Sequence, residues 1–305
     1  MAEPIIDWLN AQQENMLSLL ADLVNIDSNS FDKVGVDRVA GRLRTFFDNH
    51  AIPCETIPLP DHGDALRAVV SGGDGNRPIL LCGHRDTVFA TGEVEKRPFT
   101  MHDGKAFGPG VADMKPGLVI NAFILAAFHK FGGHPNPLIG LFTGDEEIGS
   151  PSSKNIIIAE AEKARLAFNS EPSRPNGNIV TKRKGGIFCY CAIKGVAAHS
   201  GGFFTDGRSA IEELAHKIQA LHALTDLEKG TTINVGLVQG GQSVNTVAAE
   251  ASCDIDIRYQ ETDERDDILS QVRTICETVS VAGTSSKFCI RGEFQPLNPS
   301  AQSSE

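Results

Sequence analysis

Six side chains, one imidazole and five carboxylates, stand at or just beyond the ends of apolar segments in the first half of the chain. His84 and Asp86 follow the apolar start of LLCGHRDTVF, residues 81–90, and strand alternation directs both to one side while Arg85 points to the other. Close together, such acids would repel one another without a cation. Zn²⁺ accepts nitrogen and oxygen ligands in hydrolytic sites, so the set predicts a metal site for hydrolysis. The other carboxylates are Asp113 in AFGPGVADMKPG, Glu146 and Glu147 after LIGLFTGD, and Glu171 at the end of RLAFNSE.

Alternating extended and helical patterns would bring these side chains to one edge of a sheet. The runs PILLCG and LIGLFTG are continuously apolar, which predicts a sheet covered by helices on both faces. Ligands of open α/β sheets gather at the carboxyl ends of the strands. We therefore expect an α/β domain over residues 1–181. Its expected strands are 54–59, 66–72, 78–83, 138–144 and 165–171, and its expected helices are 1–26, 35–50, 116–131 and 152–164.

From residue 182 the order of the predicted strands and helices changes. Strands and helices follow in the order βαββαβ, which is typical of a ferredoxin-like domain and predicts a separate unit over residues 182–294. The basic segment TKRKGG at 181–186 is the expected hinge, and the small, polar tail 295–305 is expected to be disordered. The expected strands are 187–195, 231–239, 249–259 and 286–292, and the expected helices are 207–223 and 262–280.

Composition excludes several classes of protein. A chain of 305 residues is long enough for two domains, and a formal charge of −11 argues against a nucleic-acid partner. No segment approaches the roughly 20 apolar residues of a membrane span. The opening segment, interrupted by acidic residues, is expected to be an amphipathic surface helix rather than a signal peptide. The seven cysteines are odd in number and lack CxxC spacing, which indicates reduced thiols and a cytoplasmic protein.

Each candidate residue alone has a simpler explanation. A histidine at a strand end is more often structural than a ligand, an aspartate such as Asp113 often caps a helix, and paired glutamates after a turn are usually solvated. The segment GPGVADMKPG matches neither GxGxxG nor GxxxxGK[ST], and the chain contains no GxSxG. Only the joint pattern favours metal chemistry over these alternatives.

The motifs GHRDTV, AFGPGVADMKPG, GDEEIGS and SEP resemble, in order, those of the dinuclear zinc exopeptidases and amidohydrolases. This family includes glutamate carboxypeptidase, acetylornithine deacetylase, succinyl-diaminopimelate desuccinylase and aminoacylase. The resemblance extends from the first helix to about residue 294 and is greatest to the glutamate carboxypeptidase branch. It implies a zinc-peptidase catalytic domain with a mixed sheet, followed by a ferredoxin-like lid and dimerisation domain.

The resemblance also implies roles for individual residues. Asp113 would bridge two zinc ions, and Asp86 would hold the ring of the ligand histidine from behind. Glu146 would be the general base that takes a proton from the attacking water and passes it to the leaving amine. The implied metal ligands are His84 and Glu171 at one ion, Glu147 at the other, and Asp113 between them.

In the second domain the resemblance singles out three residues. His199 in IKGVAAHSGG would reach the oxyanion of the reaction from the partner subunit of a homodimer formed through the lid. Asn245 and Arg258 would hold the substrate carboxylate, a task for which the planar guanidinium is suited. Without the resemblance, His199 reads as a hydrogen-bonded turn residue and Arg258 as a surface charge.

One feature of the family pattern is missing. In the family the chain returns to the first domain and supplies a second ligand histidine near its C-terminus, whereas no histidine occurs here beyond His222. His216 and His222 lie in an expected lid helix and are no substitute, so the Glu147 ion lacks its imidazole. We expect that the C-terminal part of the catalytic domain is absent, and that the chain holds one zinc where the family holds two. A truncated gene product, a chain cut at the domain boundary and a natural variant would each account for this.

The expected activity is that of a zinc-dependent metallocarboxypeptidase. Its substrate would be a small peptide or N-acyl amino acid, cleaved at an amide next to a free carboxylate such as a C-terminal glutamate. An N-acyl-amino-acid deacylase of the same family is the alternative within the same chemistry. A truncated, catalytically impaired dimeric fragment is the alternative outside it.

Overall fold

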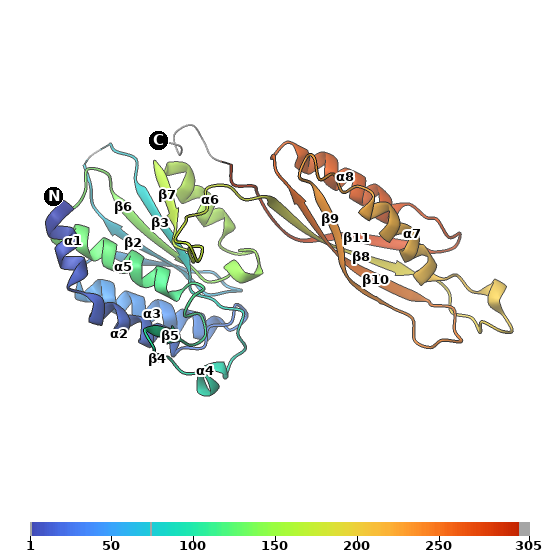
Figure 1. Cartoon of the computed structure of the whole chain (residues 1–305), viewed down its shortest axis with the longest axis horizontal. Helices are drawn as coiled ribbons and strands as arrows, with labels where there is room; N and C mark the ends of the chain where they lie inside the picture. Colours follow the sequence, from blue (N-terminus) through green and yellow to red (C-terminus); the bar gives the residue numbers. More distant parts are fainter. Residues whose placement is uncertain (1, 74, 299–305) are drawn as a thin grey trace. The chain divides into compact units, whose positions relative to one another are not determined.

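The computed structural model describes residues 2–73 and 75–298 of the chain. These residues form two compact units, which divide between Asn176 and Gly177 (Figure 1). The boundary predicted after residue 181 lies a few residues further along the chain. Each unit has its own sheet and its own apolar core.

The first unit is built on a five-stranded mixed sheet in the order β1-β2-β6-β3-β7. β3 is parallel to both β6 and β7, whereas β2 is antiparallel to β1 and β6. The carboxyl ends of β3, β6 and β7 therefore lie at one edge of the sheet. The strands are β1 (Cys54–Ile57), β2 (Ala65–Val70), β3 (Ile79–His84), β6 (Leu138–Thr143) and β7 (Leu166–Asn169).

Helices cover both faces of this sheet, as the apolar runs predict. Leu81 and Phe142 face a core shared with the helices α2, α3 and α5. Leu80 and Leu141 point the other way, into a smaller core closed by α6. All six residues of β6 are buried, because successive side chains of a strand enter opposite layers. The helices are α1 (Ala2–Asn10), α2 (Gln13–Val24), α3 (Lys33–Asn49), α5 (Lys115–Lys130) and α6 (Lys154–Lys163).

The expected single helix over residues 1–26 is wrong, because the chain forms two helices there. It breaks at Ala11 and Gln12, where the Gln12 amide bonds to the Leu9 oxygen in a tighter turn. The sequence prediction also omitted α4 (Glu93–Lys96) and the hairpin of β4 (Thr100–His102) and β5 (Lys105–Phe107). The hairpin turn is Asp103-Gly104, with φ of 52° and 70°, a pairing typical of two-residue hairpins.

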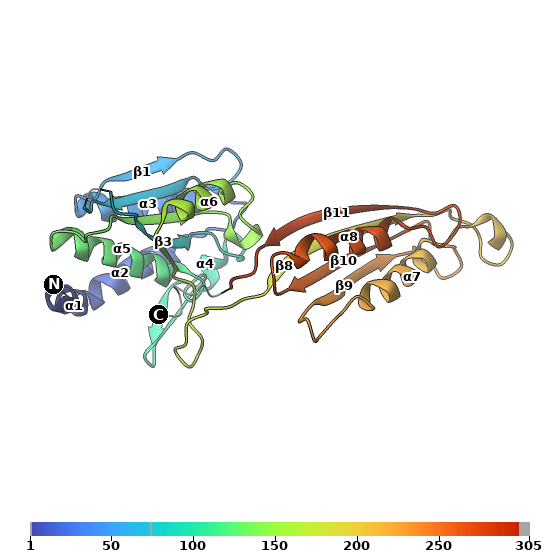
Figure 2. The ribbon, with the colours of Figure 1, turned by 90° about the horizontal axis from the view of Figure 1, so that it is seen from above.

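The second unit has the predicted βαββαβ order, and its four strands form an antiparallel sheet in the order β11-β8-β10-β9 (Figure 2). Residues such as Ile187, Cys191 and Ile255 alternate toward the core that the two helices cover. This is the ferredoxin-like arrangement. Its elements are β8 (Gly185–Lys194), η2 (Phe204–Asp206), α7 (Ala210–His222), β9 (Thr232–Gly240), β10 (Glu250–Tyr259), α8 (Glu264–Glu277) and β11 (Ser285–Phe294).

The tail expected to be disordered, 295–305, is only partly described. Leu297 forms backbone hydrogen bonds in both directions with Arg183, whereas residues 299–305 lie outside the described residues. Within residues 2–73 and 75–298, no helix combines the length and apolar character needed to cross a membrane.

A buried ion pair within α7 connects this helix to the end of α8 through further hydrogen bonds. Lys217 Nζ lies 2.7 Å from Glu213 Oε1, and both side chains are 1% exposed. Lys217 also donates to the backbone oxygens of Ile275 and Thr278 at the end of α8. Glu213 accepts from the backbone amide of Ser280, 2.9 Å away, in the segment that follows. Each charge thus depends on the other for compensation.

Replacing one partner should therefore be costly. We expect Lys217→Met to lower the free energy of unfolding of the second unit by about 3–5 kcal/mol, because Glu213 remains buried without its cation. Urea unfolding followed separately by tyrosine and tryptophan signals would measure this, since Trp8 lies in the first unit and Tyr190 and Tyr259 lie in the second.

The exposed Lys229→Met variant is the matched control and should unfold like the wild type. A Lys217→Met protein whose tyrosine transition coincides with that of the control would contradict this account of the pair.

Candidate metal centre

Three neighbouring strands of the first unit deliver the candidate ligands to one edge of the sheet. β3 ends at His84, which lies opposite Thr143, the last residue of β6. Glu146 and Glu147 follow β6 in the short helix η1 (Glu146–Ile148), and Glu171 comes just after β7. Because the carboxyl ends of parallel strands meet at one edge, side chains far apart in sequence converge there.

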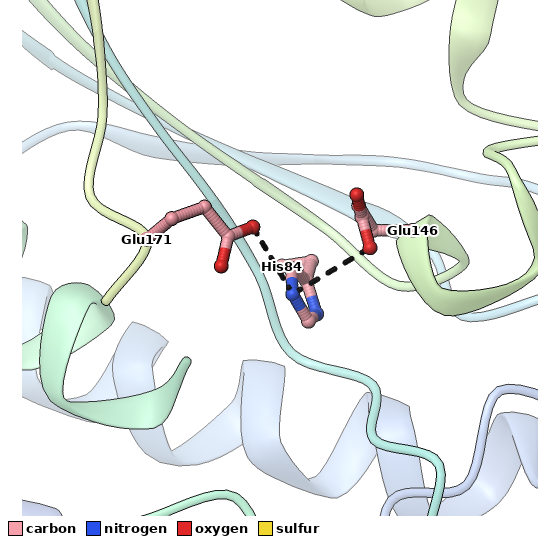
Figure 3. A group of neighbouring side chains, drawn as sticks. All are labelled: His84, Glu146 and Glu171. Carbon is pink, nitrogen blue, oxygen red and sulfur yellow. Dashed lines mark ion pairs between the residues drawn. The ribbon is translucent and has the colours of Figure 1, made fainter. Parts of the chain in front are cut away.

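The ring of His84 lies at the centre of the cluster and is 2% exposed. Its Nδ1 is 3.0 Å from the backbone oxygen of Asp86 and 3.3 Å from Asp86 Oδ1. Its Nε2 is 3.2 Å from Asp113 Oδ1. The same nitrogen is 3.4 Å from Glu171 Oε1 and 3.8 Å from Glu146 Oε2 (Figure 3). Both partners of Nδ1 are acceptors, so Nδ1 can donate toward Asp86, and Nε2 faces the other carboxylates and is the nitrogen that would face a metal.

The donor atoms fit a divalent metal. Two groups share His84, one with Glu146 and Glu171 and the other with Asp113 and Glu147, and the ligand atoms of each group lie within 4.8 Å of one another. Burial opposes the imidazolium, but hydrogen bonds to Asp113, Asp86 and Glu171 outweigh it and raise the pKa of His84. The carboxylates therefore favour positive charge at this point. One imidazole with several carboxylates is also the donor set of hydrolytic zinc sites.

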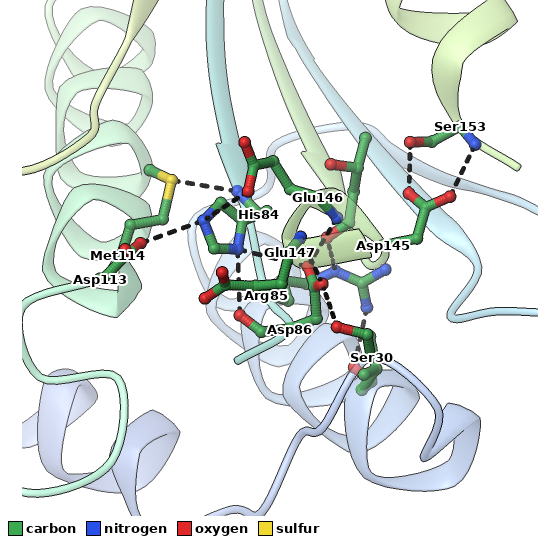
Figure 4. Close-up of polar contacts among 12 residues, drawn as sticks. Ser30, His84, Arg85, Asp86, Asp113, Met114, Asp145, Glu146, Glu147 and Ser153 are labelled. Carbon is green, nitrogen blue, oxygen red and sulfur yellow. Dashed lines mark hydrogen bonds and ion pairs between the residues drawn. The ribbon is translucent and has the colours of Figure 1, made fainter. Parts of the chain in front are cut away.

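Asp86 connects the histidine to the two glutamates. The residue is 0% exposed, and its Oδ1 and Oδ2 accept the backbone amides of Glu146 and Glu147, each at 3.1 Å (Figure 4). Oδ2 also accepts the hydroxyl of Ser30 at 2.7 Å. Burial alone would raise the pKa of Asp86, but hydrogen bonds to His84, Ser30 and the Glu147 amide lower it. Asp86 is therefore held as an anion and fixes two parts of the site at once.

Asp145 fixes the turn that carries the two glutamates. Its carboxylate accepts the hydroxyl and amide of Ser153 at 2.5 and 3.0 Å, and the amide of Ser152 at 2.7 Å. Partial burial raises the pKa of Glu147 to about 7 despite the opposing charge of His84. The pKa of Glu146 is raised for the same reasons. Each of these glutamates can therefore take up a proton more readily than an isolated carboxylate.

The loop that carries Asp113 is anchored from behind by Lys115. This ammonium group is 1% exposed and donates to the backbone oxygens of Leu23 and Ile26 at 2.9 and 2.8 Å. Burial lowers the pKa of Lys115 to about 8. A hydrogen bond to His84 holds the pKa of Asp113 below its usual value. The Asp113 loop is thus fixed to the end of α2 through backbone oxygens.

The start of α5 approaches the Glu171 segment very closely. A Cβ atom at Gly117 would lie 2.1 Å from the Ser170 oxygen, so only glycine allows this approach. The fully buried Asn121 donates to the Cys82 oxygen at 3.0 Å and accepts the Ser170 hydroxyl at 2.7 Å. α5 therefore ties the end of β3 to the segment before Glu171.

Two of the three candidate residues in the second unit lie close to each other. Ser200 donates its amide to the Asn245 oxygen at 3.0 Å, and His199 pairs with Thr246. The exposed His199 ring accepts the amides of Gly201 and Gly202 at Nδ1, at 3.1 and 3.3 Å. With Nδ1 acting as acceptor, Nε2 carries the proton and can donate outward. A hollow of about 730 Å³ at this end is lined in part by Gln242 and Thr246–Ala249.

Arg258 lies at the other end of the second unit. It stands eight positions beyond Glu250, the first residue of β10, which is roughly 26 Å at the rise of an extended strand. Its Nε is 2.9 Å from Asp256 Oδ1, and its guanidinium lies over the rings of Phe188 and Phe294, 5.2 and 5.3 Å from their centroids. The fold of one chain therefore does not bring Asn245 and Arg258 to the same small carboxylate.

Comparison with known proteins matches the second unit to the peptidase dimerisation domain over residues 181–284. Carboxypeptidase G2 of Pseudomonas sp. (strain RS-16) is 27% identical over 259 residues, which is 84% of this chain. The same alignment covers 62% of that protein, so the chain spans less than two thirds of its curated relative.

Solved structures share the fold of both units. The metallo-carboxypeptidase Sso-CP2 of the M20 family, from Sulfolobus solfataricus, has a TM-score of 0.76 at 17% identity, covering 92% of this chain and 78% of that one. The Bacillus subtilis protein YXEP, a dinuclear metal binding peptidase of the M20 family, has a TM-score of 0.64 at 14% identity, covering 96% and 77%. The chain is thus a homologue of carboxypeptidase G2 whose structural neighbours are M20 metallopeptidases, and its residues 181–284 form a peptidase dimerisation domain.

Proposed function

We propose that the protein is a zinc-dependent hydrolase that cleaves an amide bond next to a free carboxylate, such as that of a C-terminal glutamate. The observation that carries this proposal is the convergence of Asp113, Glu146 and Glu171 on the outward nitrogen of His84. The homologues are metallopeptidases, which supports the same class of reaction. The described cysteines form no disulfide, which supports a cytoplasmic location.

His84, Asp113, Glu147 and Glu171 would hold the metal. When bound, zinc supplies Lewis acidity, which polarises a carbonyl and brings the pKa of a water to roughly 7. Glu146 would take the proton of the attacking water and pass it to the leaving amine. Its raised pKa favours this role, since a stronger base accepts the proton and can still release it. The 3.8 Å between its Oε2 and His84 Nε2 also puts it within reach of a metal, so its role needs a direct test.

The second unit would supply the groups that hold the substrate. The protonated Nε2 of His199 is suited to donate to an oxyanion, and Asn245 and Arg258 are proposed to bind the carboxylate. Since Asn245 and Arg258 lie at opposite ends of β10, a shared role requires two chains. We therefore propose a homodimer, formed through the second unit, in which His199 and Asn245 serve the partner's metal centre.

The first test is the zinc content of the purified protein, measured by elemental analysis. We expect at least one ion per chain in the wild type and none in His84→Ala, because both ligand groups include this imidazole. The exposed His129→Ala variant, on the same unit, is the control and should retain its zinc. Equal zinc content in the wild type and His84→Ala would contradict the proposed metal centre.

Glu146→Gln tests the role of the base with a nearly isosteric change. We expect turnover of N-acyl-glutamate to fall about 10²- to 10⁴-fold while zinc content stays unchanged, because the amide cannot accept the proton. The exposed Glu162→Gln is the control for loss of one negative charge. Near-normal turnover would rule out the base role, and loss of zinc would make Glu146 a ligand. A panel of N-acyl amino acids and peptides would separate a deacylase from a carboxypeptidase.

Subunit exchange tests the proposed dimer. Sedimentation at micromolar concentration should give about twice the chain mass of 32.7 kDa. His84→Ala and His199→Ala should each be inactive alone, but their coexpression should restore activity, because the mixed dimer contains one complete site. A strictly monomeric protein, or mixed dimers without activity, would remove His199 from any role in the partner's site.

A further inference from the structure

We propose that Ser30 is a positioning residue of the metal centre, which acts through Asp86 and touches neither metal nor substrate. The inference rests on the proposed metal-dependent function. Ser30 is 2% exposed, and its hydroxyl donates to Asp86 Oδ2 at 2.7 Å, across 56 positions of sequence. Figure 4 shows Ser30 beside Asp86, on the side away from Asp113.

Asp86 interacts with polar groups of several residues at once. Its two oxygens face the ring nitrogen of His84, the amides of Glu146 and Glu147, and the Ser30 hydroxyl, while the residue is 0% exposed. A buried carboxylate depends on all its donors, since no water replaces one that is lost. The contact with the Ser30 hydroxyl is the shortest of these. Unlike the other partners, Ser30 lies outside the strand ends that carry the candidate ligands.

The segment that carries Ser30 is held independently of its hydroxyl. This segment connects α2 to α3 and runs beside the end of β3. Ser28 accepts the Thr87 amide at its backbone oxygen, 2.8 Å away, and the Asn29 side chain donates to the Phe89 oxygen at 3.0 Å. Removing the hydroxyl should therefore leave the segment in place. What changes is that Asp86 loses one hydrogen-bond donor.

Loss of the Ser30 hydrogen bond should affect two elements of the site. Asp86 fixes the ring of His84 through Nδ1 and fixes the turn of Glu146 and Glu147 through their amides. If its carboxylate rotates, the imidazole ring and the two glutamates are no longer held in fixed positions relative to one another. Residues that orient metal ligands in this way typically change metal affinity about 10- to 100-fold when they are altered.

Ser28 provides a matched control two positions away. It is 1% exposed, and its buried hydroxyl has no hydrogen-bond partner among the described residues. Ser28→Ala thus removes the same atom, from the same segment, at the same burial, without touching Asp86. Ser30→Thr is the conservative variant, because it keeps a hydroxyl at the position.

The experiment measures metal binding to the full-length protein, stripped of metal and titrated with Zn²⁺ against a chromophoric chelator. We expect Ser30→Ala to bind Zn²⁺ about tenfold more weakly than the wild type, at the lower end of the range for such residues. The visible absorption spectrum of the Co²⁺ form should change as well, since it reports ligand geometry. Ser28→Ala should match the wild type in both, and Ser30→Thr should recover most of the affinity.

The possible outcomes separate this proposal from the function it rests on. Equal Zn²⁺ affinities and Co²⁺ spectra for Ser30→Ala and Ser28→Ala would overturn the positioning role, as would a wild type that binds no zinc. Loss of affinity in Ser30→Ala that Ser30→Thr does not restore, together with a lowered melting temperature, would also overturn it in favour of a general packing role. A wild type that binds zinc but hydrolyses no N-acyl amino acid or peptide would overturn only the proposed function, because the affinity comparison needs no turnover.

Discussion

Electrostatic repulsion among carboxylates is the constraint on which the rest of the first unit depends. Asp113, Glu146 and Glu171 come within 3.8 Å of one imidazole nitrogen, and Asp86 lies behind the ring. Acids so close together raise one another's pKa unless a positive charge lies among them. The pKa of His84 is raised because the unliganded ring takes this part, and a divalent cation would take it more fully. The site thus favours a metal through its charge as well as through its ligand atoms.

The cluster is held largely through backbone groups and neutral side chains. Lys115 binds carbonyl oxygens, Asn121 bridges strand and helix, and Asp86, itself an anion beside the His84 ring, accepts amides and a hydroxyl. Asp145 is an acid, but its partners are the hydroxyl and amides at the start of α6, and it lies on the far side of the turn. The ligands are therefore positioned by a frame whose own polar groups are satisfied.

The sequence was sufficient to predict that the candidate side chains converge and that each unit has its main sheet, but not to predict this frame. Strand alternation at His84 and Asp86, and the rule that ligands gather at the carboxyl ends of strands, are local patterns that one sequence displays. Ser30, Lys115 and Asn121 act through contacts with residues 39 to 92 positions away, which leave no periodic signal. One clue was present, since Asn121 is the one polar side chain in the apolar run GLVINAFILAAF. The break at Gln12 had no such clue, because helical spacing continues through it.

In the second unit, the length of the strands limits which residues can contact the same ligand. β10 extends from Glu250 to Tyr259, so groups at its two ends cannot meet around one small ligand. His199 and Asn245 are held on loops at one end, whereas Arg258 is fixed at the other by Asp256 and two aromatic rings. If residues at both ends of the sheet contact substrate, as proposed, each end must serve a different site. That requirement favours a symmetric pair of chains, because two-fold symmetry supplies two equivalent sites and lets each second unit contribute one end to each.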